Sequence, residues 1–202
     1  MTRKMHKGDV TPEPDSTEDE KFLSDEWPSD NGALIDITIV AASWDTPLIN
    51  DLKARGPAML DHIATRLSLD PKRVSVLLCN DEDMCAMNKI HRGVDKATNV
   101  LAFPADDDLQ RGGDMPADEV TIGDIAIAAE TVMRESRNTG IAAGDHLLHL
   151  FIHGVLHLLG YDHEEDSPAA EMERLEIDLL AQMKIANPYH SDHPVFGMRG
   201  IE

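Results

Sequence analysis

The chain is poor in cysteine and in positive charge, and it contains no long apolar run. Its two cysteines, Cys79 and Cys85, are six residues apart, which matches neither a CxxC motif nor a disulfide scaffold. No segment approaches the ~18 consecutive apolar residues of a membrane helix. Residues 1–22 also lack the apolar segment of a secretory signal. We therefore expect reduced thiols, a cytoplasmic protein and no membrane partner.

The shortage of positive charge also restricts the binding partners. Lys and Arg total 18 while Asp and Glu total 38, which gives a formal net charge of −20. This balance argues against a protein that coats DNA through bulk positive charge, so no DNA partner is expected. A local basic patch inside a cleft remains compatible with it. Apolar residues make up 42% of the chain, which is enough for a buried core.

Both ends of the chain have the composition of tails. Residues 1–32 hold nine acidic side chains, four basic ones and three prolines, with few large apolar residues. Such a segment cannot bury enough surface to offset its ordering entropy, so we expect it to be disordered. Residues 187–202 are expected to be a second tail. A single domain over residues 33–186 remains between them.

Apolar patterns predict about four strands and four to five helices in this domain. The strands are expected at residues 34–41, 73–79, 99–103 and 122–128. Thr46 is expected to cap the first helix, Gly56-Pro57 to kink or break it, and Asn80 to cap the second. A nearly all-apolar segment at 146–159 should form a central, buried helix. The predicted fold class is therefore α+β.

Three histidines between residues 150 and 165 predict a metal site at the end of that central helix. His153 and His157 are four residues apart, so their imidazoles share one helix face and can reach one ion. Gly160 can end the helix in the left-handed conformation and bring His163 back to the same point. Three ligands with one open position are typical of catalytic zinc. A stripe of histidines that only packs in the core is the alternative.

The neighbours of these histidines narrow the chemistry. Gly154 stands where HExxH metalloproteases carry the glutamate that acts as general base, so a peptidase of that type would lack its base. We expect His149 to support the ligands or pack beside them, and His146 to be structural. Asp162 could orient a ligand or simply shape the turn.

A second group of candidates lies at residues 87–104, in the segment MNKIHRGVDKATNVLAFP. Three cations form a local positive island in this acidic chain: Lys89, Arg92 and Lys96. The guanidinium of Arg92 suits bidentate phosphate binding. Thr98 and Asn99 can donate to oxyanions or shape the turn into the next strand. Arg92 could instead pair with Asp95 and merely brace the loop.

Both groups of residues resemble the motifs of one known family. The segment HGVLHLLGYDH at residues 153–163 resembles the signature of the YbeY family of bacterial endoribonucleases and ribosomal RNA maturation factors. The segment at residues 87–104 resembles the second motif of that family, and IGDIAIA and AAEMERLEIDLL are similar to its strand and last helix. The resemblance covers roughly residues 34–186. Ala102 departs from the serine of the TNVLSFP version, and the N-terminal tail is not part of the pattern.

The resemblance implies a mixed sheet and one metal ion per chain, usually Zn²⁺, held by His153, His157 and His163. It also implies that Arg92 is the functionally important arginine, expected to neutralise charge on the reacting phosphate. Lys96 and Asn99 are the further candidates for substrate binding. The implied activity is single-strand-specific RNA cleavage in ribosomal RNA processing, including 3′-end maturation of the small-subunit RNA, and in ribosome quality control. The implied partners are RNA and the small ribosomal subunit or its assembly factors.

Two other functions stay open at this point. A peptidase can also use three histidines, although Gly154 counts against it. A ribosome-assembly factor without catalytic activity could use the metal only to stabilise its fold. The residues also leave open whether water or the 2′-hydroxyl of the RNA attacks the phosphate.

Overall fold

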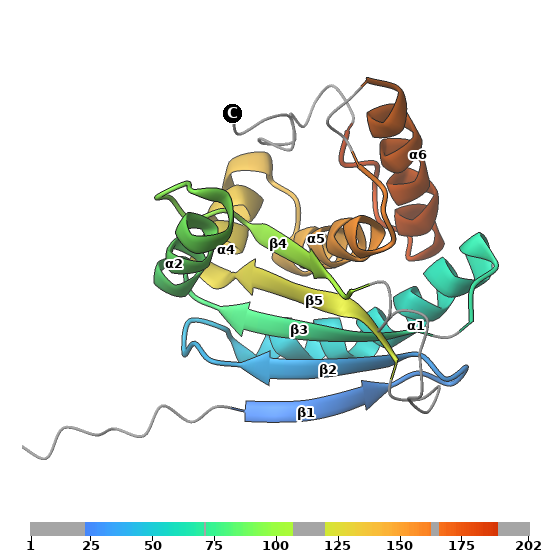
Figure 1. Cartoon of the computed structure of the whole chain (residues 1–202), viewed down its shortest axis with the longest axis horizontal. Coiled ribbons are helices and arrows are strands. Elements are labelled where there is room, and N and C mark those ends of the chain that lie inside the picture. Colours follow the sequence, from blue (N-terminus) through green and yellow to red (C-terminus); the bar gives the residue numbers. More distant parts are fainter. Residues whose placement is uncertain (1–22, 71, 107–119, 163–165, 190–202) are drawn as a thin grey trace, which may run out of the picture.

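The computed structural model of the chain describes residues 23–70, 72–106, 120–162 and 166–189. Its strands form one mixed sheet in the order β1-β2-β3-β5-β4 (Figure 1). Their bounds are β1 (Leu23–Pro28), β2 (Leu34–Ile39), β3 (Arg73–Cys79), β4 (Val100–Pro104) and β5 (Thr121–Ala128). The inner strands β2, β3 and β5 are parallel, and the edge strands β1 and β4 are antiparallel to their neighbours. The predicted α+β class is confirmed, with one strand more than expected.

Five helices belong to the described part of the chain. They are α1 (Thr46–Leu67), α2 (Asp81–Arg92), α4 (Ala129–Thr139), α5 (Ala143–Leu158) and α6 (Asp166–Gln182). Helix α5 packs against β4, β5 and α1, and α6 packs against α5 (Figure 1). None of the helices that the structure describes is long and apolar enough to cross a membrane.

The sheet separates two apolar clusters of different size. The larger cluster joins α1, α5 and α6 to one face, and the smaller one lies where α2 covers the other face. Along β4, Val100 belongs to the larger cluster and its neighbour Leu101 to the smaller one, because successive side chains of a strand point to opposite faces. Helix α5 is therefore enclosed between the sheet and other helices.

Local signals predicted the start of α2 correctly and that of α1 only in part. The side chain of Asn80 accepts a hydrogen bond from the Asp83 amide at 2.7 Å, as an N-cap should. For α1 the cap is Asp45 rather than Thr46, since the Asp45 carboxylate accepts from Leu48 N at 2.8 Å. The helix also continues through Pro57 without a break. Buried packing of this part of α1 against the sheet outweighs the hydrogen bond that proline cannot make.

The prediction of a disordered tail over residues 1–32 is wrong for residues 23–32. Leu23–Pro28 forms the edge strand β1, and Trp27, only 2% exposed, pairs in register with Ile35. The turn after β1 is held by Asp61, whose carboxylate accepts from Ser29 at 2.8 Å and from Asn31 at 3.1 Å. Residues 1–22 lie outside the described residues.

The expected C-terminal tail, residues 187–202, begins with residues that contact the domain. The hydroxyl of Tyr189 donates to the buried carboxylate of Glu176. The domain therefore extends beyond residue 186. Residues 190–202 lie outside the described part.

Candidate metal centre

Helix α5 carries two of the three predicted metal histidines, of which His153 is buried and His157 is half-buried. Twelve of its 16 residues are buried, among them His146, His149 and His153. The helix ends at Leu158, and Gly160 follows with a φ of +87°. That left-handed conformation suits glycine, and it allows Tyr161 N to donate back to Leu156 O at 3.0 Å. The predicted glycine stop after the helix is confirmed.

His153 and His157 form a close pair on this helix. Their Nε2 atoms lie 2.9 Å apart, and the two rings meet edge to face. Nδ1 of His153 faces Oε1 of Glu176 at 2.7 Å, and Nδ1 of His157 faces the carbonyl oxygen of Tyr161 at 3.0 Å. Both partners accept hydrogen bonds, so both Nδ1 atoms carry the proton in the neutral rings. The two facing Nε2 atoms then both present lone pairs.

This arrangement fits a bound cation. Two lone pairs at 2.9 Å repel each other unless a positive charge lies between them or beside them. Neutral imidazole nitrogens are the donors that zinc and similar ions prefer, and metal-binding histidines ordinarily donate their other N–H to a carboxylate or a carbonyl. His153 and His157 meet both conditions. The third expected ligand, His163, lies outside the described residues. Among the described residues, no three His, Cys, Asp or Glu side chains are placed so that together they could hold a metal ion.

Glu176 on α6 contacts the histidine pair, and sequence reasoning did not single it out. It is fully buried and accepts from both His153 and His149, the latter at 3.2 Å. Burial raises the pKa of Glu176, but the hydrogen bonds from His149 and His153 outweigh burial and hold this pKa well below its ordinary value. Burial and the Glu176 charge in turn raise the pKa of Tyr189, so its hydroxyl stays protonated and donates to Glu176. The sequence does contain a signal for Glu176. It is a carboxylate on the otherwise apolar face of α6, between Met172 and Leu179.

Close packing against the sheet requires a glycine at position 154. A Cβ atom at this position would lie 3.0 Å from both Cδ1 and Cγ2 of Ile125 on β5. Such a contact is tighter than ordinary van der Waals packing, and a glutamate would need far more room. Position 154, where HExxH peptidases carry the glutamate that acts as general base, therefore faces the core in this protein. Asp162, the other uncertain neighbour, is exposed.

The second group of candidates lies between α2 and β4. Arg92 is the last residue of α2, and its side chain is exposed with no ion pair to any described residue. Asp95 pairs with Lys89 instead, at 2.6 Å. Lys96 is exposed, and its carbonyl accepts from the buried Asn88 amide at 2.7 Å. The loop is thus anchored through its backbone while its cations face solvent.

Asn99 is placed differently from the two cations. Its Nδ2 donates to Glu135 on α4 at 3.1 Å, and its Oδ1 accepts from Val100 N at 2.8 Å. The Asn99 side chain is therefore engaged inside the protein. β4, which starts immediately after Asn99, packs along α5 and links this loop to the histidine helix (Figure 1).

Comparison with known proteins identifies the family of the chain. A sequence model of the family described as Endoribonuclease YbeY matches residues 43–184, a range that includes both groups of candidates. The chain belongs to the YbeY family. The resemblance inferred from the two motifs is thereby confirmed.

Individual members of the YbeY family align with the chain at moderate to high identity. Three relatives are named Endoribonuclease YbeY. The one from Rhodospirillum rubrum is 50% identical over 121 residues, 59% of each chain. The one from Dinoroseobacter shibae is 39% identical over 79% of this chain and 92% of its own. The one from Bartonella quintana is 39% identical over 77% and 96%, respectively. Among solved structures, a Thermotoga maritima protein aligns with a TM-score of 0.48 at 23% identity, over 74% of this chain and 91% of its own.

Proposed function

We propose that this chain is a metal-dependent endoribonuclease that cleaves single-stranded RNA in the cytoplasm during ribosomal RNA processing. Membership of the YbeY family and the names of its relatives support the activity. Maturation of the 3′ end of the small-subunit RNA and ribosome quality control are the processes we assign to it. The observation that carries the proposal is the pair of facing Nε2 atoms of His153 and His157, whose Nδ1 atoms are both held by acceptors.

His153, His157 and His163 would hold the ion, which we propose to be one Zn²⁺ per chain. When bound, such an ion supplies a Lewis acid and lowers the pKa of a coordinated water toward ~7. Glu176 fixes the ring orientation of His153, and the Tyr161 carbonyl does the same for His157.

The cations of the second motif would act on the RNA phosphate. Arg92 presents a planar, exposed guanidinium with no ion pair to any residue that the structure describes. It can therefore bind a phosphate in two-pronged fashion without first breaking an ion pair, and it can neutralise charge that develops in the transition state. Lys96 adds a second exposed charge four residues later. Asn99 supports this loop from inside the protein rather than from the solvent side.

The decisive experiment measures metal content and RNA cleavage on the same purified protein. We expect about one metal per chain and cleavage of a single-stranded RNA, with little cleavage of the matching duplex. A chelator should abolish cleavage, and added zinc should restore it. Cleavage that survives complete metal removal would contradict the proposal. A peptide library serves as the parallel substrate, and peptide cleavage without RNA cleavage would favour a peptidase. A metal-loaded protein that cleaves neither substrate would favour a ribosome-assembly factor.

A further inference from the structure

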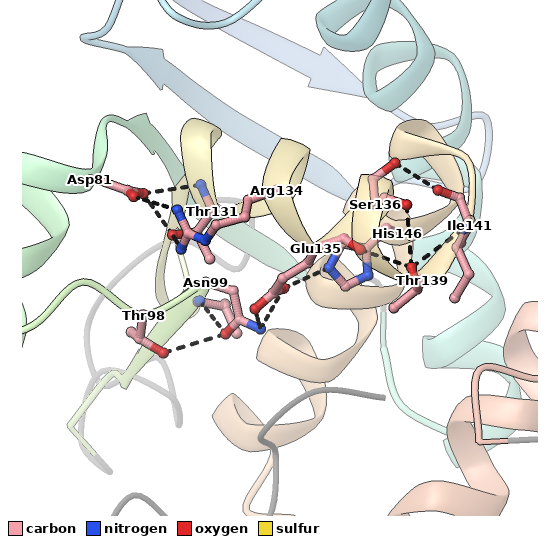
Figure 2. A network of polar contacts seen from close by, with 11 residues as sticks. Asp81, Thr98, Asn99, Thr131, Arg134, Glu135, Ser136, Thr139, Ile141 and His146 are labelled. Atoms are coloured by element: carbon pink, nitrogen blue, oxygen red, sulfur yellow. Dashed lines mark hydrogen bonds and ion pairs between the residues drawn. The ribbon is translucent and has the colours of Figure 1, made fainter. Parts of the chain in front are cut away.

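A partly buried polar network joins the loop that follows Arg92, residues 93–99, to the helix that carries His153 and His157. Glu135 on α4 stands at its centre. Its carboxylate accepts from Nδ2 of Asn99 at 3.1 Å and from Nε2 of His146 at 2.8 Å (Figure 2). His146 lies in the first turn of α5, two turns before His153. The Glu135 side chain therefore holds both the end of this loop and the start of α5.

The loop is held at both of its ends. At the α2 side, the buried Asn88 amide donates to the Lys96 carbonyl at 2.7 Å. At the β4 side, Asn99 accepts from Val100 N through its side chain and from Ala128 N at 3.0 Å through its carbonyl. Oδ1 of Asn99 can accept from Val100 N in only one orientation of the side-chain amide, and the hydrogen bond from Nδ2 to Glu135 fixes that orientation.

Helix α4 is itself tied to both neighbouring helices. Arg134 donates to Asp81 at the start of α2 at 3.0 Å, and Thr131 donates to the same carboxylate at 2.7 Å (Figure 2). Glu135, next to Arg134, makes the corresponding link to α5. His146 is buried, and its Nδ1 has no hydrogen-bond partner among the described residues, so its contact with Glu135 determines how the ring is held.

From this network we infer that Glu135 is a positioning residue, which fixes the loop that follows Arg92 relative to the histidine helix through Asn99 and His146. The inference rests on the proposed function, because its consequence is the rate of RNA cleavage. Misplacement of a catalytic group by about 1 Å can cost on the order of 100-fold in rate. The metal ligands themselves are oriented by Glu176 and Tyr161, so metal binding should not depend on Glu135.

The test exchanges the donor and the acceptor of the central hydrogen bond. Asn99→Asp places a carboxylate against Glu135, and we expect the turnover rate to fall on the order of 10- to 100-fold with metal content unchanged. Adding Glu135→Gln restores the pairing, because the glutamine amide donates to the new carboxylate and its oxygen still accepts from His146. This double variant should regain most of the lost rate. Asn99→Asp/Glu130→Gln is the matched control. Its second substitution also removes a negative charge from α4, but Glu130 does not contact Asn99.

Melting curves, metal content, kcat and KM are measured on all four proteins. The inference is supported if Glu135→Gln restores the turnover rate of the Asn99→Asp protein and Glu130→Gln does not. If the Asn99→Asp/Glu135→Gln protein stays as slow as Asn99→Asp, or if Asn99→Asp cleaves normally, Glu135 is not a positioning residue. A wild-type protein that cleaves no RNA would instead overturn the proposed function.

A double-mutant cycle provides the second, independent measurement. Glu135→Ala should slow cleavage in the wild-type background and have little further effect in an Arg92→Ala background, because the group it positions is already gone. Additive losses in the two backgrounds would assign Glu135 a purely structural role.

Discussion

Nζ of Lys89 lies 2.6 Å from Oδ2 of Asp95, and this ion pair occupies the carboxylate that could otherwise have braced Arg92. The hydrogen bond and the charge of each partner raise the pKa of Lys89 and lower the pKa of Asp95. The loop is thus braced by the lysine, while the arginine at the end of α2 remains exposed. Because Lys89 and not Arg92 braces the loop, a substitution of Arg92 tests its role in RNA cleavage separately from loop stability.

Arg92→Ala should leave the fold and the metal intact and abolish most RNA cleavage. We expect a loss of about 2.7–4 kcal/mol in transition-state stabilisation, the range for removing one preorganised donor to a developing oxyanion. Arg92→Lys should recover only part of it, because an ammonium keeps the charge but loses the two-pronged geometry. Single-turnover cleavage rates and melting curves measure the two effects separately.

Arg137→Ala is the control for this variant, since it removes an exposed positive charge from α4. It should cleave RNA at nearly the wild-type rate. A loss of stability in Arg92→Ala that matches its loss of activity, together with a normal Arg92→Lys, would show that Arg92 only supports the loop.

His157→Ala should release the metal, because the remaining imidazoles cannot hold it tightly. Metal analysis after dialysis measures the loss, and thermal unfolding should show a lower melting temperature because the ion no longer stabilises the folded state. His62→Ala, at an exposed histidine of α1, should keep the full metal content. Stoichiometric metal and full activity in His157→Ala would refute the histidine site.

Glu176→Gln should weaken metal binding without removing any ligand. The carboxylate accepts from His153 and His149, and loss of such a partner typically costs 10- to 100-fold in metal affinity. Competition with a chelator, at a temperature where the variant is folded, gives the dissociation constant. Glu171→Gln, at an exposed position of the same helix, is the matched control. Equal affinities in the two variants would mean that Glu176 serves only stability.

Trp27→Ala should destabilise the domain, whereas deletion of residues 1–22 should not. Trp27 is buried in the larger apolar cluster, and truncation of such a side chain costs about 3–5 kcal/mol in the free energy of unfolding. Leu23→Ala on the same strand should cost within about 0.5 kcal/mol, since Leu23 is exposed. Denaturant unfolding compares the three proteins with the full chain. A large loss on deletion of residues 1–22 would show that this segment packs on the domain.

The two cysteines should differ in reactivity toward iodoacetamide. Burial raises the pKa of Cys79 to about 12, so its thiol stays protonated and unreactive in the folded protein. Because the unfolded thiol ionises near pH ~8.5, Cys79 should also make the domain less stable as pH rises from there toward 12. The difference in unfolding free energy between wild type and Cys79→Ala across this range isolates the effect.

Cys85 should react in the folded state, although slowly. Burial and its hydrogen bond to Asp95 raise the pKa of this thiol. Asp95→Asn should therefore lower that pKa and speed labelling at pH 8, while Cys79 stays unlabelled until denaturant is added. Mass spectrometry of the labelled peptides distinguishes the two sites. Faster labelling of Cys79 than of Cys85 in the native protein would contradict both assignments.

The sequence alone determined those features that depend on residues close together in the chain. The four-residue spacing of His153 and His157 pairs them on any helix, and Gly160 adopts the left-handed conformation after it at little cost. Asn80 likewise caps α2 through an amide three residues away. Four of the five described strands were also predictable, because their apolar residues are concentrated in short segments.

Tertiary structure alone decided which distant residues support the site. Glu176 reaches His153 across 23 positions, and Glu135 reaches Asn99 across 36, so neither partnership leaves a spacing signal in the sequence. β1 was missed for a related reason. Its side chains are exposed except for Trp27, and backbone hydrogen bonds to β2 hold a segment whose composition is that of a tail. Local patterns report which face of an element is apolar, but only the packed fold determines which carboxylate meets which histidine.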